Sequence, residues 1–195
     1  RSKVVEMGQL IAGPFCGKTL GEFGAEVVKI EPLEGDMSRS VPPYFVGDDS
    51  AYFLSTNRGK KSVAVDMKSD DGRSLVRDLI GKSDVVIENF KAGGLARFGL
   101  DYATLSARNP GLVYASVTGF GQTGPRASQP GYDFMIQGMG GIMELTGDPA
   151  GDPQKVGVAW IDIFTGLYGV IGIQAALAER ARSGRGQQVD LALFD

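Results

Sequence analysis

The sequence contains no histidine among its 195 residues, and it contains a single cysteine. The absence of histidine excludes Ser-His and Cys-His nucleophile pairs and the common histidine-based zinc sites. One cysteine excludes an internal disulfide and any multi-cysteine metal site, and it suits a reducing compartment. We expect Cys16 to be a small buried hydrophobic side chain. Catalysis by this chain would therefore depend on carboxylates, Lys, Tyr or Ser.

A strong charge of either sign and a long apolar run are also missing. The net charge of -3 and the pI near 5.1 give no basic field for nucleic acid or for an anionic membrane surface. The longest apolar stretches, 156–161 and 166–173, are well short of the roughly 20 residues that cross a bilayer. We therefore expect no nucleic-acid partner, no signal peptide and no membrane anchor. A cytoplasmic location follows, or the mitochondrial matrix or peroxisome in a eukaryote.

The residues that are present alternate between short β-branched runs and longer amphipathic segments, which favours an α/β domain with a largely parallel sheet. The hydrophobic share of 43% and the charged share of 22% are typical of a globular protein. Strands are predicted at 4–5, 26–31, 62–66, 84–88, 112–118 and 188–194. Helices are predicted at 14–23, 70–80, 103–106, 132–146 and 163–182.

Two Pro- and Gly-rich stretches, 32–49 and 119–131, interrupt this pattern and are long enough to be functional loops. Neither has the composition of a domain linker, so residues 1–195 are expected to form one domain. The sequence ends at Asp195, inside or just after a predicted strand. We therefore expect the chain to be a piece of a longer polypeptide.

Residues 119–124 fit the G-x-G-x-x-G pattern of dinucleotide-binding proteins, and Glu144 follows about 20 residues later. That fingerprint requires the third glycine to lead into a helix whose N-terminus binds the pyrophosphate. Here Pro125 and Pro130 extend the loop instead. The two prolines therefore argue against a dinucleotide site.

Two aspartates stand at predicted helix starts. The simplest interpretation of Asp162, and of Asp133 before the segment 134–146, is helix capping. Asp162 also suits a nucleophile, because helix N-terminal amides favour an ionised carboxylate and could donate to an oxyanion. An ordinary aspartate has a pKa near 4 and is ionised at neutral pH.

The glycines at 166, 169 and 172 leave one face of the predicted helix 163–182 without side chains, so that another backbone or a flat ligand can approach closely.

Cationic residues follow two predicted strands. Lys91 and Arg97 come after strand 84–88, and Lys68 comes after strand 62–66. Ligands of open α/β sheets bind at the carboxyl ends of the strands, so these residues could form an anion site. Solvated surface charge is the alternative interpretation for each.

A set of segments spread along nearly the whole chain has the pattern of one enzyme family: 12–14, 20–32, 35–39, 57–68, 84–91, 97–100, 119–125, 130–133 and 184–190. Together these segments resemble the family III coenzyme A transferases. The resemblance implies a Rossmann-like, largely parallel sheet flanked by helices, as the N-terminal part of the large domain that binds coenzyme A and carries the catalytic residue.

The resemblance also implies site residues. Asp162 matches the family's catalytic aspartate, which precedes the apolar helix leading to Gly-x-Gly-Gln-x-Val-Asp. Lys91 stands where many members have arginine, which binds phosphate bidentately, whereas lysine binds it as a point charge. Because Arg97 and Lys68 map onto the family's coenzyme contacts without such a departure, they are the stronger candidates for phosphate contacts. The implied coenzyme A contacts are Gln9, Ile11, Ala12, Lys68, Asn89, Phe90 and Arg97.

The implied reaction moves coenzyme A from an acyl-CoA to a free carboxylic acid through an aspartyl anhydride and an aspartyl-CoA thioester. Acyl-CoA and the acid are then the small-molecule partners, with no metal and no permanently bound cofactor. The family's α-methylacyl-CoA racemases use a histidine where this chain has Tyr132, whose ordinary pKa near 10 is poorly matched to moving an α-proton. A racemase and a non-catalytic acyl-CoA-binding protein stay as alternatives. The resemblance further implies an interlocked homodimer.

Overall fold

A computed structural model describes residues 1–195 as a six-stranded parallel sheet flanked by helices. The strand order is β5-β2-β1-β6-β7-β8, so the chain reverses its direction of travel across the sheet between β1 and β6. Ligands of doubly wound sheets bind at such a reversal. The predicted α/β class is confirmed. The strands are β1 (Lys3–Glu6), β2 (Glu26–Glu31), β5 (Lys61–Ala64), β6 (Val85–Glu88), β7 (Val113–Thr118) and β8 (Gln188–Ala192).

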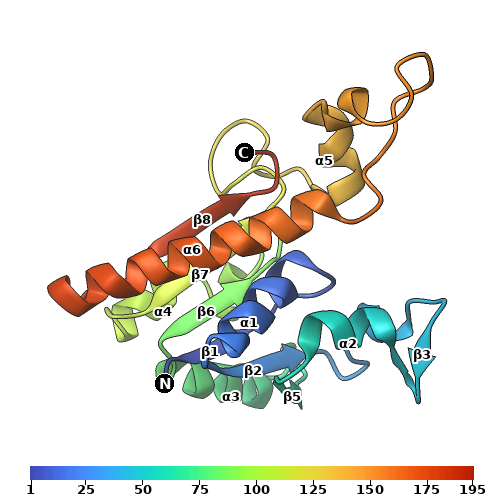
Figure 1. The fold of residues 1–195 in the computed structure, drawn as a ribbon. Coiled ribbons are helices and arrows are strands. Elements are labelled where there is room, and N and C mark those ends of the chain that lie inside the picture. Colours follow the sequence, from blue (N-terminus) through green and yellow to red (C-terminus); the bar gives the residue numbers. More distant parts are fainter.

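Helices cover both faces of the sheet (Figure 1). On one face, α1 (Ala12–Glu22) and α6 (Trp160–Ser183) pack against the sheet and against each other, and α2 (Ala51–Asn57) lies beside α1. On the other face lie α3 (Asp70–Gly81) and α4 (Tyr102–Arg108). Burial on both faces explains why the central strands read as continuous apolar runs.

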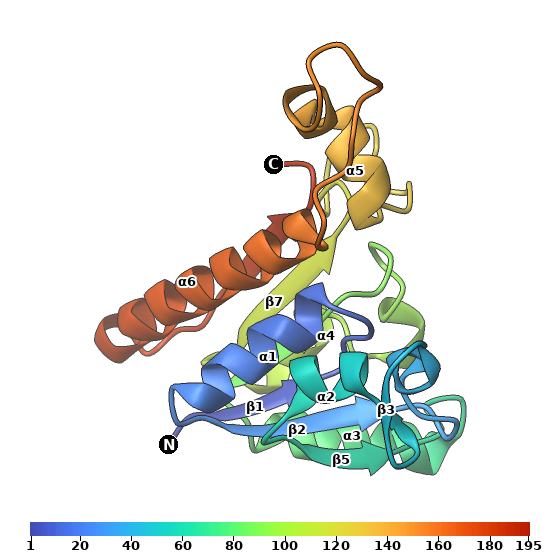
Figure 2. The same cartoon turned by 45° about the vertical axis from the view of Figure 1, so that its right-hand side comes forward.

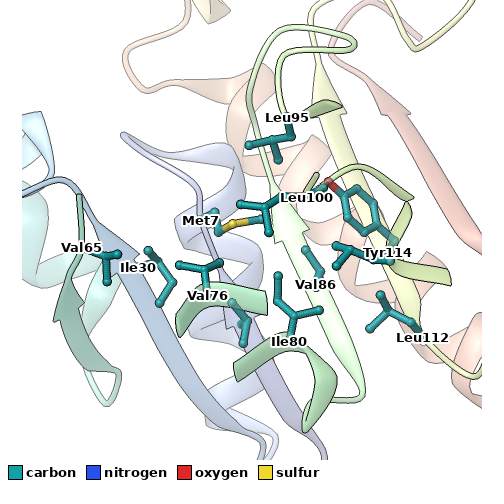
Figure 3. Close-up of a cluster of buried hydrophobic side chains, with 12 residues drawn as sticks. Met7, Ile30, Val65, Val76, Ile80, Val86, Leu95, Leu100, Leu112 and Tyr114 are labelled. Carbon is teal, nitrogen blue, oxygen red and sulfur yellow. Dashed lines mark hydrogen bonds between the residues drawn. The ribbon is translucent and has the colours of Figure 1, made fainter. Parts of the chain in front are cut away.

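The largest hydrophobic cluster lies under α3 and α4 and contains 12 buried residues (Figure 3). Val76 and Ile80 of α3 meet Val86 of β6 there, at the i, i+4 spacing of a helix face. Tyr114 of β7 is buried among them, and its hydroxyl donates to the Leu100 carbonyl oxygen at 2.8 Å. The most deeply buried phenol therefore has the hydrogen bond that burial demands.

The glycines of α6 let the backbone of α1 approach closely. A Cβ atom at Gly166 would lie 2.9 Å from the Ala12 carbonyl oxygen, and one at Gly169 would lie 3.0 Å from Cys16 Sγ. The bare helix face predicted from the sequence therefore receives a neighbouring helix rather than a flat ligand. Cys16 is fully buried, as predicted, and burial raises its pKa to about 12.

Helix α6 is long and apolar enough to cross a bilayer by length and composition alone, with a mean hydropathy of 1.5 over 18 residues. The expectation that no segment is long and apolar enough to cross a bilayer is therefore wrong, because that expectation rested on shorter apolar runs taken one at a time. In the fold, α6 packs along α1, β7 and β8.

The structure departs from the predicted elements in several places, and helix α2 was not predicted at all. Helix 132–146 is broken into α5 (Asp133–Met139) and the short 3-10 helix η3 (Ile142–Leu145), because Gly141 adopts a left-handed φ of 82° between them. The predicted loop 32–49 contains η1 (Met37–Ser40) and β3 (Phe45–Val46), and β3 pairs with β4 (Asp49–Ser50). In Figure 2, α5 and the chain leading to α6 extend away from the sheet.

Candidate active site

A cavity of about 380 Å³ opens at the carboxyl ends of the strands, where the strand order reverses. Its walls come from the segments that follow β1 and β6, from the ends of β7 and β8, and from the start of α6. Parallel strands bring all their carboxyl ends to one edge, so residues far apart in the sequence meet there. The cavity is therefore the place where the predicted site residues can be compared.

Six of the eight predicted site residues line this cavity, and two do not. Lys68 and Arg97 are exposed outside it, and the Arg97 guanidinium lies 4.5 Å from the centre of the Phe98 ring. Lys91, ranked below them as a phosphate contact, lines the cavity. The roles assigned to these residues from the sequence stay predictions. The residues brought together are Gln9, Ile11, Ala12, Asn89, Phe90 and Asp162.

Asp162 is the third residue of α6, and it does not cap the helix. The N-cap position belongs to Ala159, which supplies no side-chain hydrogen bond. Instead, the Asp162 backbone N–H donates to Asp133 Oδ2 at 3.0 Å, and the other Asp133 oxygen accepts from Gln137 Nε2. Both capping interpretations are corrected: Asp133 begins α5, and its carboxylate satisfies an unpaired amide of α6.

The carboxylates of Asp133 and Asp162, the aspartate pair, have no cation beside them. Neither forms a salt bridge with a lysine or an arginine. Burial, and then repulsion from Asp133, raise the pKa of Asp162 to about 7. The expectation of an ordinary, fully ionised aspartate is therefore wrong: near neutral pH a large fraction of Asp162 is protonated.

Tyr52 of α2 also stands in the field of Asp162. Burial, and then the negative charge of Asp162, raise the pKa of Tyr52 to about 12. The sequence analysis missed this residue because α2 has only seven residues and follows a hairpin, so it shows little helical periodicity.

Segment 8–12, here called the loop wall, is held from behind by buried charges. Lys29 Nζ donates to the Gly8 carbonyl oxygen at 2.6 Å and contacts Glu6 Oε1 at 3.1 Å and Asp36 Oδ2 at 2.9 Å. Lys60 Nζ contacts Glu6 Oε2 at 2.6 Å and donates to the Pro14 carbonyl oxygen at 2.8 Å. All four charged side chains are at most 2% exposed. Two cations thus match two carboxylates.

The pKa values of the two lysines follow from this arrangement. For Lys29, burial opposes the charged form, but attraction by Glu6 and Asp36 outweighs it and raises the pKa. For Lys60, burial outweighs the attraction of Glu6 and lowers the pKa. Lys29 is therefore the cation that the surrounding carboxylates stabilise most clearly.

The loop wall carries backbone strain at Leu10, where φ is 66° in a residue other than glycine. Its N–H donates to Asp36 Oδ1 at 3.4 Å. Next to it, Gln9 is clamped to Asn89 twice, through its N–H at 3.0 Å and its carbonyl oxygen at 2.8 Å. The side chain of Asn89 thus joins the segment after β6 to the segment after β1.

Glu88, at the end of β6, is a second buried carboxylate near the cavity that sequence reasoning missed. Its Oε2 accepts from the Phe90 N–H at 2.8 Å, which fixes the segment that lines the cavity. Burial, and to a smaller extent the charge of Asp190, raise the pKa of Glu88 to about 7. The sequence signal that could have identified Glu88 is a carboxylate at the end of an otherwise apolar strand.

Gly119 and Gly131 allow the two ends of the 119–131 loop to come together. A Cβ atom at Gly119 would lie 2.5 Å from the Gly131 Cα atom, so the two ends of the loop cross at backbone contact. Both glycines line the cavity. The next helix, α5, begins only after Gly131, so no helix follows Gly124 as a dinucleotide fingerprint requires.

The arrangement provides a partly buried carboxylate with a raised pKa at the wall of a cavity. A carboxylate of this kind can act as a nucleophile toward a carbonyl carbon or as a proton carrier near neutral pH.

Known proteins are similar to this chain over nearly its whole length. A sequence model described as CoA-transferase family III matches residues 2–195. The chain is 52% identical to succinate–glutarate CoA-transferase of Agrobacterium fabrum over 200 residues, and this match covers 99% of the chain and 50% of the relative. It is 44% identical to succinyl-CoA:mesaconate CoA-transferase of Haloarcula hispanica, with 99% and 51% covered.

Among solved structures, a CAIB/BAIF family protein from Brucella suis matches with a TM-score of 0.97 and 57% identity, covering 100% of the chain and 52% of that protein. The chain thus spans about half the length of the relatives it matches. The match to the family nevertheless extends over almost every residue of the chain. The chain belongs to CoA-transferase family III.

Proposed function

We propose that the protein containing this chain transfers coenzyme A from an acyl-CoA thioester to a free carboxylic acid, with Asp162 as the covalent carrier. The observation that carries the proposal is the position of Asp162: its carboxylate lines the cavity at the sheet reversal together with five of the predicted coenzyme contacts. The names of the two relatives pair succinate with glutarate and succinyl-CoA with mesaconate, which makes dicarboxylates the first acids to test.

In the first half-reaction, an Asp162 oxygen attacks the thioester carbonyl carbon. The carbon–sulfur bond breaks, which leaves a mixed anhydride and the coenzyme A thiolate. The thiolate then attacks the Asp162 carbonyl carbon, forms an aspartyl-CoA thioester and releases the donor acid as a carboxylate. Covalent storage conserves the energy of the thioester without ATP.

The second half-reaction reverses these steps with a new acid. The acceptor carboxylate attacks the aspartyl thioester, displaces the thiolate and forms a second anhydride. The thiolate then attacks the acceptor carbonyl carbon, which gives the new acyl-CoA and restores the Asp162 carboxylate. Because both anhydrides hydrolyse readily in water, the reaction needs an enclosed site, and Asp162 is partly buried.

The raised pKa of Asp162 sets the pH dependence of the first step. Only the ionised carboxylate attacks, so transfer should rise with pH through about 7.

A product assay tests the proposal. The whole natural protein is incubated with succinyl-CoA and a panel of carboxylic acids that includes glutarate and mesaconate, and new thioesters are identified by mass spectrometry. Transfer should be abolished in Asp162→Ala, with coenzyme A binding and folding retained. Wild-type turnover in that variant would remove Asp162 from the reaction. Exchange of an α-proton without a new thioester would indicate racemisation, and binding without either reaction would indicate a binding protein.

We also propose that the whole protein is a homodimer. Large apolar side chains are exposed along α5 and α6 and in η3, including Phe134, Leu145, Tyr168 and Ile171, each more than 60% exposed. An apolar surface of this kind marks an interaction site on a soluble protein. Light scattering of the whole protein should give twice the monomer mass, and a monomer at micromolar concentration would contradict the proposal.

A further inference from the structure

The Thr118 hydroxyl is a buried polar group at the cavity that has no partner within the protein. Thr118 is the last residue of β7, is 8% exposed and lines the cavity, and its Oγ1 makes no hydrogen bond. A hydroxyl buried without a hydrogen bond destabilises the folded protein, because it gives up its hydrogen bonds to water and gains none in return. Valine has nearly the same shape and suits a strand equally well, so packing alone does not explain a threonine here.

The two preceding side chains on the same strand face show what is unusual about this hydroxyl. Side chains alternate along a strand, so Tyr114, Ser116 and Thr118 share one face of β7. The Tyr114 hydroxyl donates to the Leu100 carbonyl oxygen at 2.8 Å, and Ser116 Oγ accepts from Gln188 Nε2 at 3.1 Å. Of these three residues only Thr118 lines the cavity, and only its hydroxyl is left without a partner.

The surroundings of Thr118 favour a neutral ligand group. Its chain neighbours Val117 and Gly119 line the cavity and carry no charge, and Lys91 is the one cation in the whole lining. Phosphate oxygens would require local cations or water, whereas a hydroxyl can donate one hydrogen bond to a carbonyl oxygen. The carbonyl groups of an acyl-CoA chain are the thioester and the two amides of its pantetheine arm.

We infer that Thr118 is a substrate-binding residue whose hydroxyl donates to a carbonyl oxygen of the bound coenzyme A chain. This inference rests on the proposed function, because it takes an acyl-CoA as the ligand. The ligand would supply the partner that the fold lacks, so the hydroxyl should favour the bound state and not the free protein.

The test compares Thr118→Val with Thr118→Ser and with Tyr114→Phe in the whole protein. Tyr114→Phe is the matched control, because it removes a paired hydroxyl from the same strand face at a position outside the cavity. Affinity is measured by calorimetry for coenzyme A and for an acyl-CoA analogue in which a methylene group replaces the sulfur. Stability without ligand is measured by urea unfolding.

Thr118→Val should bind about tenfold more weakly, and its urea midpoint should be unchanged or higher. Thr118→Ser should retain the affinity, while Tyr114→Phe should lower the midpoint and leave the affinity unchanged. Weaker binding of both ligands assigns the bond to a pantetheine amide, and weaker binding of the analogue alone assigns it to the thioester carbonyl.

Wild-type affinity of Thr118→Val for both ligands would overturn the inference and leave the proposed function standing. A midpoint that falls as far as in Tyr114→Phe would overturn it as well, since the hydroxyl would then have a partner in the free protein. Wild-type protein that binds neither ligand would overturn the proposed function and this inference together.

Discussion

The loop wall and Asp162 line the same cavity, but buried charge is treated in opposite ways behind the loop wall and in the aspartate pair. Behind the loop wall, Glu6 and Asp36 are matched by Lys29 and Lys60 at 2.6–3.1 Å. The aspartate pair has no cation, and the pKa of Asp162 rises to about 7. Matched charges stabilise a shape, whereas an unmatched carboxylate raises the energy of the folded protein. The proposed role of Asp162 therefore rests on buried charge that is left uncompensated, rather than on buried charge as such.

The largest effect on stability is expected at Lys29. Lys29→Met removes the cation between Glu6 and Asp36 and leaves an uncompensated buried charge, which should reduce the free energy of unfolding by about 3–5 kcal/mol. Urea unfolding measures the loss. Arg180→Met is the matched control, because Arg180 pairs with Asp84 in a partly exposed bridge at the other end of the sheet, and about 1 kcal/mol or less is expected there. Equal losses in the two variants would remove the distinction.

A change of opposite sign is expected at Asp162. Its pKa is about 7 in the folded protein against an ordinary value of 3.8, so the folded state binds the proton more tightly than the unfolded state. The resulting destabilisation is absent at low pH, grows as pH rises from about 4 to 7 and is complete above 7. Asp162→Asn should therefore be inactive yet more stable than wild type at pH 8, by on the order of 3 kcal/mol.

Urea unfolding of both proteins at pH 8 and at pH 4.5 tests this sign. The difference should shrink strongly at the lower pH. A difference that does not change with pH would show that Asp162 is not a strained carboxylate.

Asp133→Asn separates the two members of the aspartate pair. Removal of the neighbouring negative charge should lower the pKa of Asp162, so the acid limb of kcat/KM for transfer should move to lower pH by about one unit. The pH profile measures the shift. Asp148→Asn, at an exposed carboxylate in the loop before α6, should leave the limb in place. An unmoved limb in Asp133→Asn would assign it to another group, such as Glu88.

The smallest effect is expected at the exposed cations. Arg97→Ala should weaken coenzyme A binding roughly fivefold, because a solvated charge contributes up to about 1 kcal/mol. Calorimetry at low and high salt measures it, since screening should reduce the difference. Unchanged affinity at low salt would exclude Arg97 from the site and favour Lys91, which lines the cavity.

The sequence predicted the sheet because its signals are local. The run at 26–31 matches β2 at both ends, since β-branched residues bounded by turns define a strand without help from the rest of the fold. Helix α2 escaped prediction because its seven residues are too few to show a period. The break between α5 and η3 depends on the left-handed Gly141, and glycine alone does not say which conformation it adopts.

The sequence predicted which residues belong to the candidate site, but it did not predict which side chains contact one another there. The resemblance placed Asp162 and the segments after β1 and β6 together, and the structure brings them to one cavity. The partner of Asp162, however, is Asp133 from 29 residues earlier, and the charges behind the loop wall come from β1, from β2, from the N-cap of η1 and from the residue before β5. Such pairings depend on tertiary packing, which no local pattern encodes.

The covalent role of Asp162 is tested most directly by isotope transfer. The whole protein turns over succinyl-CoA with an acceptor acid labelled with oxygen-18 in both carboxylate positions, and the peptide containing Asp162 is then weighed. Attack of the labelled carboxylate on the aspartyl thioester, followed by attack of the thiolate on the acceptor carbonyl carbon, leaves one labelled oxygen on Asp162. The account predicts a peptide heavier by one oxygen-18 label after a single turnover and by one or two after repeated turnover, and repeated turnover with an unlabelled Asp162 would contradict it.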